Sequence, residues 1–267
     1  MATAPIDPSL RIASVRLAVA DLARSAEFYE RTLGLPLIGR EEERALLGSD
    51  AAQPALELVP IADPVPLSPR STGLFHVAWL HPTRAGLADT VRRIVASRWP
   101  IEGASDHGVS EALYLSDPDG LGIEIYADRP RERWQAGAGG HGVRMFTAQL
   151  DLEDLLAQGS DGPSSQIEAG TGIGHVHLKV ADVPRAHAFY RDELGFEEMA
   201  LLPSAAFLSA GGYHHHIGLN SWQSGGADAA PANAPGLRET RFTIKGASPR
   251  TLADPDGNAL SFGPAPG

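Results

Sequence analysis

Histidines and a few acidic residues are the side chains of this sequence that could do chemistry. The chain holds ten histidines and no cysteine, so metal binding or acid–base catalysis through imidazole is open to it, whereas disulfide and thiolate chemistry are not. Three consecutive histidines, His214–His216, lie in the stretch GGYHHHIGLN. His175 and His177 lie in GHVHLKV, two residues apart, so both project to one face of the strand that this stretch predicts.

Two further candidates lie on predicted strands in the first half of the chain. His76 belongs to GLFHVAWL, and Glu124 belongs to the isoleucine-rich stretch GIEIYAD, which we expect to be at least half buried. A carboxylate buried there needs a partner, because an unpaired buried charge is costly. A single histidine on a strand is more often a packed core residue than a ligand, and Glu124 could equally face solvent. The residues alone leave these alternatives open.

The composition limits the classes of protein to consider. The chain has 267 residues, of which 43% are hydrophobic, enough for one large domain or two ordinary ones. Its net charge of −11 argues against a nucleic-acid surface. No apolar run approaches the roughly 20 residues of a membrane span, and the start MATAPIDPSL lacks the basic and apolar regions of a signal peptide. We therefore expect a cytoplasmic protein with neither a nucleic-acid nor a membrane partner.

The sequence contains an internal repeat. IASVRLAVADLARSAEFYERTLGLPL, residues 12–37, aligns without a gap with IGHVHLKVADVPRAHAFYRDELGFEE, residues 173–198. Each copy predicts a strand, an Asp N-cap, a helix and a terminating glycine; these are Asp21 and Gly34, then Asp182 and Gly195. The tetrapeptide Asp-Pro-Asp-Gly occurs at 117–120 and 254–257, and it predicts a turn before a last strand each time.

These repeats divide the chain into four modules, at roughly 10–61, 71–128, 171–222 and 236–263. The second contains a predicted helix at 84–97. The fourth is short, because only residues 245–250 separate its first strand from its Asp-Pro-Asp-Gly turn, so its helix is expected to be missing. We predict an N-terminal half at 10–128, a Gly/Ser/Asp-rich linker at 129–170 with a short helix near 152–157, and a C-terminal half at 171–263.

Modules of one strand, one helix and three strands, with FYxxxLG closing the helix and DPDG before the last strand, resemble the vicinal oxygen chelate superfamily. That superfamily includes glyoxalases, bleomycin-binding proteins and extradiol ring-cleaving dioxygenases. The resemblance covers most of the chain outside the linkers. It implies an α+β fold of four βαβββ-type modules, the last one shortened, which form two cup-shaped mixed-sheet barrels. A metal would lie in the cup, held by first and last strands of the modules.

The resemblance also implies a set of metal ligands. Glu124 matches the carboxylate ligand that follows DPDG on the last strand, and His76 matches the first-strand ligand. His175 directly follows a glycine, as in the extradiol pattern, which leaves His177 as a neighbour or a fallback ligand. Two histidines and one carboxylate form the facial triad of non-haem Fe(II) oxygenases, so Fe(II) is the expected cofactor, with Mn or Zn less favoured.

Three catalytic residues follow from the same resemblance. The segment HGVSEALYLSDPDGLGIEIY, residues 107–126, resembles the extradiol segment that carries a hydrogen-bonding histidine and a pocket tyrosine, here His107 and Tyr114. The acid–base histidine is expected in YHHHIGLN, where His215 is the best match. YHHHIGLN is expected to be the last strand of its module, in which His214 and His216 share one face and His215 has the other, and a bulge would exchange the two faces.

Neither the first and second modules together nor the third and fourth together carry a complete set of ligands. The fourth module has Glu239 or Thr240, and Ser261, at the ligand positions, and the first has Ser14. If the second module pairs with the third, all six candidates meet: His76, Glu124, His175, His107, Tyr114 and His215. We predict this pairing within one chain; the alternative is a swapped dimer.

The function implied is extradiol (meta) cleavage of a catechol-type aromatic diol with dioxygen, as in catechol 2,3-dioxygenases of aromatic hydrocarbon catabolism. One alternative is a glyoxalase-like metal-dependent isomerase or lyase. Another is a metal-free protein that binds a small molecule such as a drug. The expected partners are a catechol-like molecule and dioxygen, and the sequence leaves open both the ring substituents and whether the chain forms a homo-oligomer.

Overall fold

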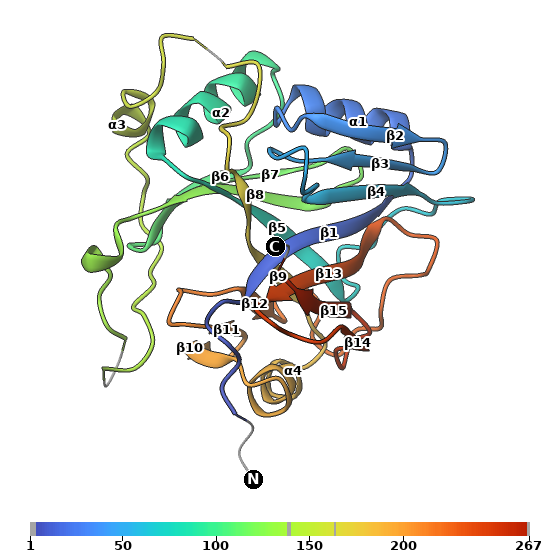
Figure 1. Cartoon of the computed structure of the whole chain (residues 1–267), viewed down its shortest axis with the longest axis vertical. Helices are drawn as coiled ribbons and strands as arrows, with labels where there is room; N and C mark the ends of the chain where they lie inside the picture. Colours follow the sequence, from blue (N-terminus) through green and yellow to red (C-terminus); the bar gives the residue numbers. More distant parts are fainter. Residues whose placement is uncertain (1–3, 138–139, 163, 266–267) are drawn as a thin grey trace.

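The first strands of the four modules lie side by side at the centre of one mixed sheet in a computed structural model, which describes residues 4–137, 140–162 and 164–265 (Figure 1). They are neighbours in the order β13, β1, β9 and β5. Their bounds are Gly236–Ile244, Arg11–Val19, Gly172–Lys179 and Gly73–His81. Every module of the sequence therefore contributes its opening strand to the middle of the molecule.

The remaining elements follow the predicted modules. The first module continues with α1 (Leu22–Arg31), β2 (Leu37–Glu41), β3 (Arg44–Leu47) and β4 (Leu56–Pro60). The second continues with α2 (Arg84–Ala96), β6 (Gly103–Asp106), β7 (Ser110–Ser116) and β8 (Gly122–Asp128). The third continues with α4 (Val183–Ala188), a π-helical turn (Phe189–Glu193), β10 (Glu197–Leu202), β11 (Ala205–Ser209) and β12 (Ile217–Asn220). The fourth has only β14 (Arg250–Ala253) and β15 (Ala259–Pro264) after its first strand.

Between the halves lie the 3₁₀ turn η1 (Arg131–Arg133) and the short helix α3 (Leu152–Leu156), which falls where a helix was predicted. The predicted α+β fold of four modules, the last without a helix, is confirmed. The predicted residue boundaries of the two halves and of the linker stay a prediction. Of the helices in the described ranges, none is both long and apolar enough to cross a membrane.

Strand pairing groups the second module with the third. β5 pairs with β9, and the strand order β6-β7-β8-β5-β9-β12-β11-β10 forms one curved half of the sheet. β1 pairs with β13, and β14-β15-β13-β1-β4-β3-β2 forms the other half. β1 of one half meets β9 of the other at a bridge between Ile12 and Ile173. The module pairing predicted within one chain is therefore confirmed. Among the described residues β6 and β10 do not pair, so this half is an open cup rather than a closed barrel.

Consecutive modules are tied together by a hydrogen-bond pattern that occurs twice. The Tyr29 hydroxyl on α1 donates to Asp117 of the first Asp-Pro-Asp-Gly turn, at 3.2 Å. The Tyr190 hydroxyl donates to Asp254 of the second such turn, at 3.0 Å. The tyrosine of each FYxxxLG motif thus anchors the turn of the next module, which explains why the two motifs recur together.

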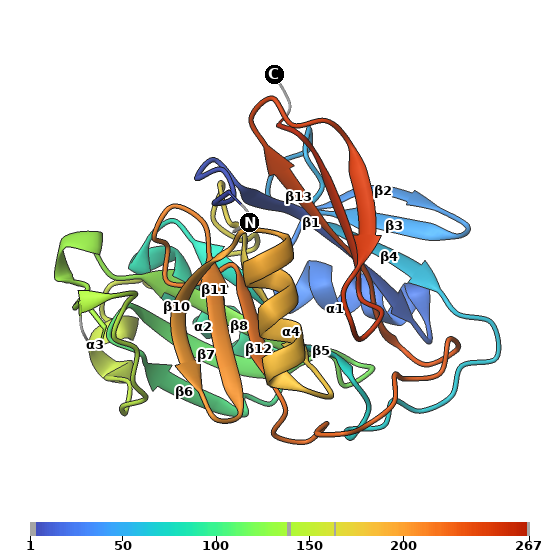
Figure 2. The same cartoon turned by 90° about the horizontal axis from the view of Figure 1, so that it is seen from below.

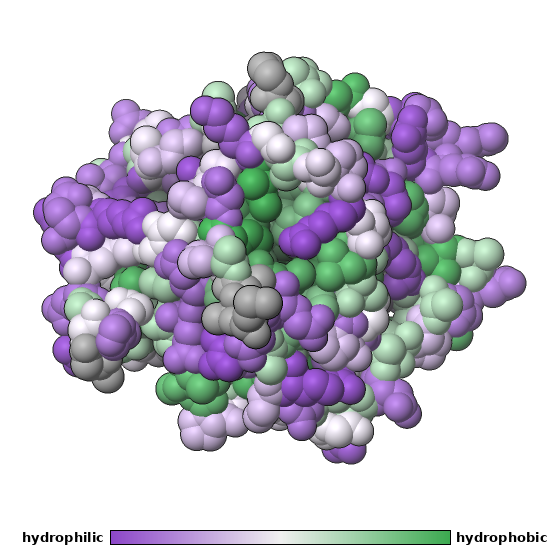
Figure 3. Space-filling model, turned by 60° about the horizontal axis from the view of Figure 1, so that its bottom comes forward, coloured by the Kyte–Doolittle hydropathy of each residue, from purple (hydrophilic) through white to green (hydrophobic). Residues whose placement is uncertain are grey.

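The helices cover the outside of the cups and leave the inside free. α2 lies against β5 and β8, and α4 lies against β11 and β12 (Figures 1 and 2). On β8, Ile123 and Ile125 belong to the main hydrophobic core, whereas Glu124 between them projects to the opposite, concave face. On the face of the molecule in Figure 3, hydrophilic residues cover most of the rim and hydrophobic residues gather near the middle.

Candidate active site

Strand register brings the three predicted metal ligands together. Ala78 on β5 is the register partner of both Glu124 on β8 and His175 on β9. His76 lies two residues before Ala78 and so projects to the same concave face. All three predicted ligands are buried, with exposed fractions of 5% for His76, 3% for Glu124 and 2% for His175. Three different strands therefore present one donor group each to the same point.

The donor atoms have the spacing of a metal site. The Nε2 atoms of His76 and His175 are 3.3 Å apart. Oε2 of Glu124 lies 3.0 Å from Nε2 of His76 and 3.1 Å from Nε2 of His175. Ligands bound at about 2.1 Å on one face of a metal ion are about 3 Å apart, so these residues fit a two-histidine, one-carboxylate centre.

The electrostatics of the cluster suit a cation. Burial alone would raise the pKa of Glu124, but His175 and His76 together lower it well below its ordinary value. Burial lowers the pKa of His175 to about 4, although Glu124 opposes this shift. At neutral pH the carboxylate is therefore charged and His175 is neutral, and those are the forms that bind metal.

A second cluster of possible ligands shares His175 and adds His214 and His215. It contains no carboxylate, and both ring nitrogens of His214 already have partners. Nε2 of His214 lies 2.9 Å from Oδ1 of Asp128, and its Nδ1 lies 2.8 Å from Nδ1 of His215. The set of His76, Glu124 and His175 is therefore the better metal centre.

The metal-ligand set lies in the wall of a cavity of about 470 Å³. His107, Tyr114, His177 and His215 also line it. Most of its other side chains are apolar: Phe75, Val109, Met145, Phe146, Leu202, Phe207 and Trp222. An apolar cavity with a few converging polar groups is typical of a small-molecule site, and the aromatic walls suit a flat ring.

His177 stands beside the metal-ligand set rather than within it. Its ring centre is 5.0 Å from that of His76, and it also contacts Phe207 and Trp222. Burial, reinforced by His76, lowers its pKa well below the ordinary value. His177, which the sequence left as a neighbour or a fallback ligand, therefore lies in the cavity wall as a neutral side chain beside the metal-ligand set.

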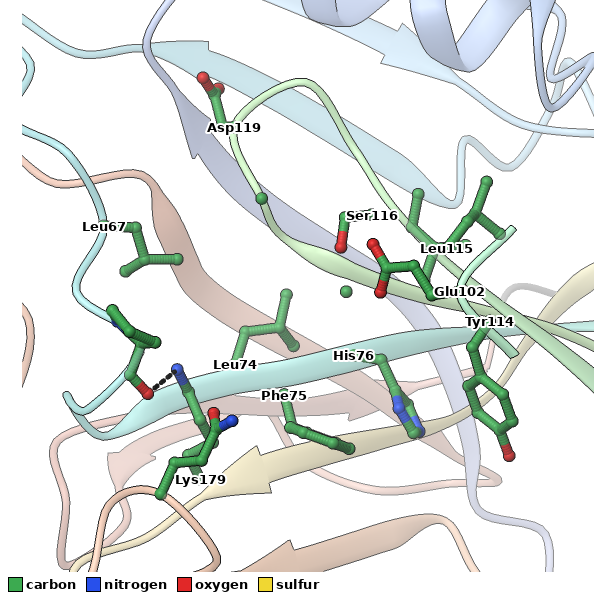
Figure 4. A pocket seen from close by; sticks show the side chains of 15 residues that line it. Leu67, Leu74, Phe75, His76, Glu102, Tyr114, Leu115, Ser116, Asp119 and Lys179 are labelled. Carbon is green, nitrogen blue, oxygen red and sulfur yellow. Dashed lines mark hydrogen bonds between the residues drawn. The ribbon is translucent and has the colours of Figure 1, made fainter. Parts of the chain in front are cut away.

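An adjoining cavity of about 350 Å³ shares Phe75, His76 and Tyr114 with the first (Figure 4). Figure 4 shows His76 and Tyr114 at one end of it and Lys179 at the other. Nζ of Lys179 donates to the carbonyl oxygen of Pro69 at 3.3 Å. Of the three proposed ligands, His76 therefore borders both cavities.

His107 and Tyr114 form a hydrogen-bonded pair at the cavity. Nε2 of His107 lies 2.6 Å from the Tyr114 hydroxyl, and Nδ1 of His107 lies 2.8 Å from the carbonyl oxygen of Phe146. A carbonyl only accepts, so Nδ1 carries a proton and, in the neutral ring, Nε2 accepts from the Tyr114 hydroxyl. Burial, followed by the charge of Glu124, raises the pKa of Tyr114, so the phenol stays protonated.

The three consecutive histidines precede β12 instead of belonging to it. β12 begins at Ile217, and residues 213–216 are irregular, so the predicted strand over YHHHIGLN was wrong at this end. The three histidine side chains, His214, His215 and His216, point in different directions.

His215 lines the cavity, with its ring centre 4.0 Å from that of His175. His214 meets Asp128, whereas Nδ1 of His216 accepts from the Ser209 hydroxyl at 2.9 Å, outside this cavity.

Asp128 and Tyr213 also belong to the surroundings of the site, although neither was predicted from the sequence. The Tyr213 hydroxyl lies 2.7 Å from the Tyr126 hydroxyl and 3.3 Å from Oδ1 of Asp128. A signal for Asp128 was available, because Glu124, Tyr126 and Asp128 alternate along β8 and so share its concave face. No such signal pointed to Tyr213, which lies in the irregular segment before β12.

The sequence of this chain is similar to those of known proteins. Residues 11–125 and 172–232 match the sequence model of the Glyoxalase/Bleomycin resistance protein/Dioxygenase superfamily. A catechol-2,3-dioxygenase of Bacillus subtilis (strain 168) is 43% identical over 235 residues, which span 87% of this chain and 82% of that protein.

Solved structures with the same fold include a putative dioxygenase from Bacillus subtilis subsp. subtilis str. 168. It matches with a TM-score of 0.63 and 14% identity, over 99% of this chain and 87% of that one. Glyoxalase I from Zea mays matches with a TM-score of 0.57 and 16% identity, over 95% and 92% of the two chains. At such identities these likenesses show the fold alone.

Proposed function

Because this chain belongs to the glyoxalase/bleomycin resistance protein/dioxygenase superfamily, we propose that it is an extradiol dioxygenase that opens the ring of a catechol-type diol. The observation that carries the proposal is the convergence of His76, Glu124 and His175 at the wall of an apolar cavity. A two-histidine, one-carboxylate set favours non-haem Fe(II), with Mn or Zn as less favoured occupants. The relative named as a catechol-2,3-dioxygenase supports a catechol as the substrate class.

Fe(II), when bound to this set, supplies a site for chelation of a diol beside dioxygen and for electron transfer between them. The overall reaction breaks the ring carbon–carbon bond next to the diol and places both atoms of dioxygen in the product. This reaction balances without an external reductant, because the diol supplies all the electrons that dioxygen accepts. The remaining tasks belong to side chains: holding the ring, and accepting and returning protons.

His215 is the proposed acid–base residue. It lines the cavity beside His175, and burial, reinforced by His175 and His214, lowers its pKa well below the ordinary value. A neutral imidazole in that position can take the proton that the diol loses on binding and return it later to the opening ring.

Tyr114 is the proposed hydrogen-bonding partner of a substrate oxygen, and His107 is proposed to orient the Tyr114 hydroxyl. Both ring nitrogens of His107 are engaged by Phe146 and Tyr114, so His107 orients the phenol and does not itself bind substrate. The apolar walls, with Phe75, Phe207 and Trp222 among them, would hold the aromatic ring and exclude water.

The test is to purify the protein at low oxygen, load it with Fe(II), Mn(II) or Zn(II), and add catechol. We expect oxygen uptake and a yellow ring-opened product with Fe(II), and neither with the Glu124→Gln variant. The matched control is His141→Ala, which removes an exposed histidine. Turnover of a hemithioacetal with Zn(II) and none of catechol would favour a glyoxalase-like enzyme instead. Tight binding of an aromatic molecule, with no turnover and no response to a chelator, would favour a metal-free binding protein.

A further inference from the structure

Asp128, His214 and His215 form a continuous line of hydrogen bonds from the rim of the protein to the cavity. Oδ1 of Asp128 lies 2.9 Å from Nε2 of His214, and Nδ1 of His214 lies 2.8 Å from Nδ1 of His215. The Asp128 side chain is 25% exposed, whereas that of His214 is 1% exposed. His215 is buried and lines the cavity. The line therefore connects solvent with the proposed acid–base residue.

The direction of each hydrogen bond in this line follows from its first member. An ionised carboxylate can only accept hydrogen bonds, and Oδ1 of Asp128 accepts from the Tyr213 hydroxyl at 3.3 Å. The nitrogen of His214 that contacts the same oxygen, Nε2, therefore carries a proton. In the neutral ring of His214, Nδ1 then has only a lone pair and must accept from Nδ1 of His215. Consequently the proton of a neutral His215 is on Nδ1, and its Nε2 has a free lone pair.

The surrounding aromatic rings hold this geometry in place. The His215 ring is packed between His175, at a centroid distance of 4.0 Å, and Phe207, at 5.0 Å. The His214 ring is packed between Tyr213, at 4.1 Å, and Trp134, at 5.4 Å. These ring contacts hold the plane of each imidazole, while the hydrogen bonds set which nitrogen faces which partner.

We infer that His214 and Asp128 are positioning residues that hold His215 in the Nδ1–H tautomer, with Nε2 as the hydrogen-bond acceptor toward the cavity. In the opposite tautomer, Nε2 would present a proton to the diol and could not accept one. The catalytic meaning of this arrangement rests on the proposed function. The tautomer itself is a property of the protein that can be measured without any turnover.

Two substitutions at His214 separate hydrogen-bond direction from mere packing. His214→Phe keeps an aromatic ring against Tyr213 and Trp134 but removes both nitrogens. His214→Gln offers an amide N–H to Asp128 and an amide oxygen to Nδ1 of His215, so it restores the direction of both bonds. The amide does not accept a proton at neutral pH, so rescue by Gln would assign His214 an orienting role.

The decisive measurement is nitrogen-15 NMR of the histidine rings in protein loaded with diamagnetic Zn(II). We expect Nδ1–H for His215 in the wild type and in His214→Gln, and loss of that preference in His214→Phe. In the Fe(II) form, we expect His214→Phe to lower kcat for catechol roughly 10- to 100-fold with KM nearly unchanged, as for loss of a positioned general base. His214→Gln should recover most of that loss.

An Nε2–H form of His215 in the wild type, or in a folded His214→Gln variant, would overturn the inference. Loss of bound metal from His214→Phe would also overturn it, because it would assign the metal to His175, His214 and His215. If the tautomers behave as expected but no protein form cleaves catechol, the positioning role stands and the proposed function fails.

Discussion

The Nε2 atoms of His76 and His175 lie 3.3 Å apart, although 99 positions separate the two residues in the sequence. The first lies on the opening strand of the second module, and the second lies on the opening strand of the third. They meet because β5 and β9 pair antiparallel, with Ala78 in register with His175. Glu124 completes the set from β8, on the other side of β5. The ligands of two different modules thus meet because β5 pairs with β8 on one side and with β9 on the other.

Replacing Glu124 with Gln should abolish metal binding at this site. The carboxylate supplies the only negative charge among the three ligands, and an amide oxygen is a far weaker ligand for a divalent cation. We expect the metal content after dialysis to fall from about one ion per chain to near zero. The thermal stabilisation that added metal gives the wild type should disappear as well. Glu43→Gln, an exposed change in the turn between β2 and β3, is the control. Full metal content in Glu124→Gln would exclude Glu124 as a ligand.

Replacing Tyr114 with Phe should reduce turnover without loss of metal. The change removes the hydroxyl that contacts His107 at 2.6 Å and that we propose to contact the substrate. We expect kcat/KM for catechol to fall by about 10- to 100-fold, measured by oxygen uptake. Tyr190→Phe is the matched control, because it removes another buried hydroxyl, the one that donates to Asp254. That control should lower the melting temperature but leave kcat/KM unchanged, and equal loss of activity in both variants would assign Tyr114 a structural role.

The metal-free protein should lose stability as the pH falls below about 6.5, and His81 should account for part of this loss. His81 is 1% exposed, and burial, reinforced by Arg93, lowers its pKa to about 3. Between that value and the ordinary histidine pKa, the unfolded chain binds a proton that the folded chain does not. The stabilisation is complete above the ordinary pKa and is lost progressively as the pH falls toward 3.

Denaturant titration of wild type and His81→Leu at several pH values between about 4 and 6 measures this effect. The slope of unfolding free energy against pH should decrease by about 1.4 kcal/mol per pH unit in the variant, the value for one proton. His141→Ala, at an exposed site, controls for the loss of a histidine. Parallel curves for wild type and His81→Leu would contradict a neutral buried His81.

Replacing Gly122 with Ala should weaken both the fold and the metal site. A Cβ atom at Gly122 would lie 2.0 Å from the backbone oxygen of Phe75, so β8 would have to move away from β5. We expect a loss of about 1–3 kcal/mol in unfolding free energy, as for overpacking, and weaker metal binding because Glu124 moves with β8. Gly263→Ala is the control, since nothing lies within 4 Å of its added Cβ. Wild-type stability and metal affinity in Gly122→Ala would show that the two strands can separate freely at this point.

Much of the architecture follows from local signals in the sequence. Asp21 and Asp182 cap their helices by accepting from Arg24 N and Arg185 N, as an Asp before an amphipathic stretch predicts. Gly34 and Gly195 end those helices with φ values of 76° and 81°, a conformation that favours glycine. The short distance between β13 and the second Asp-Pro-Asp-Gly turn left no room for a fourth helix. Helix caps, helix ends and short connections depend on residues that are adjacent in the sequence, so the sequence alone determines them.

The candidate ligands were also expected before the structure, because each lies where the pattern of the vicinal oxygen chelate superfamily carries a ligand, although the residues alone left other roles open for His76 and Glu124. The distribution of the ligands predicted that the second and third modules share a cup, but the sequence left open whether they do so within one chain or across a swapped dimer. Every module opens with a similar strand, and periodicity carries no information about which strands pair across long stretches of chain. The antiparallel pairing of β5 with β9 decided it, by placing the donors of two modules on one concave face.

Only the tertiary structure decided the directions of His214, His215 and His216. Strand alternation could not apply, because Gly211 and Gly212 adopt φ values of 62° and 63° and the chain becomes extended only at Ile217. His214 instead takes its direction from Asp128, 86 residues earlier in the chain, and His215 from His214 beside it. The sequence determined that three imidazoles lie next to one another in a segment that the resemblance assigns to the site. Their directions depend on long-range partners and irregular backbone, which no local pattern encodes.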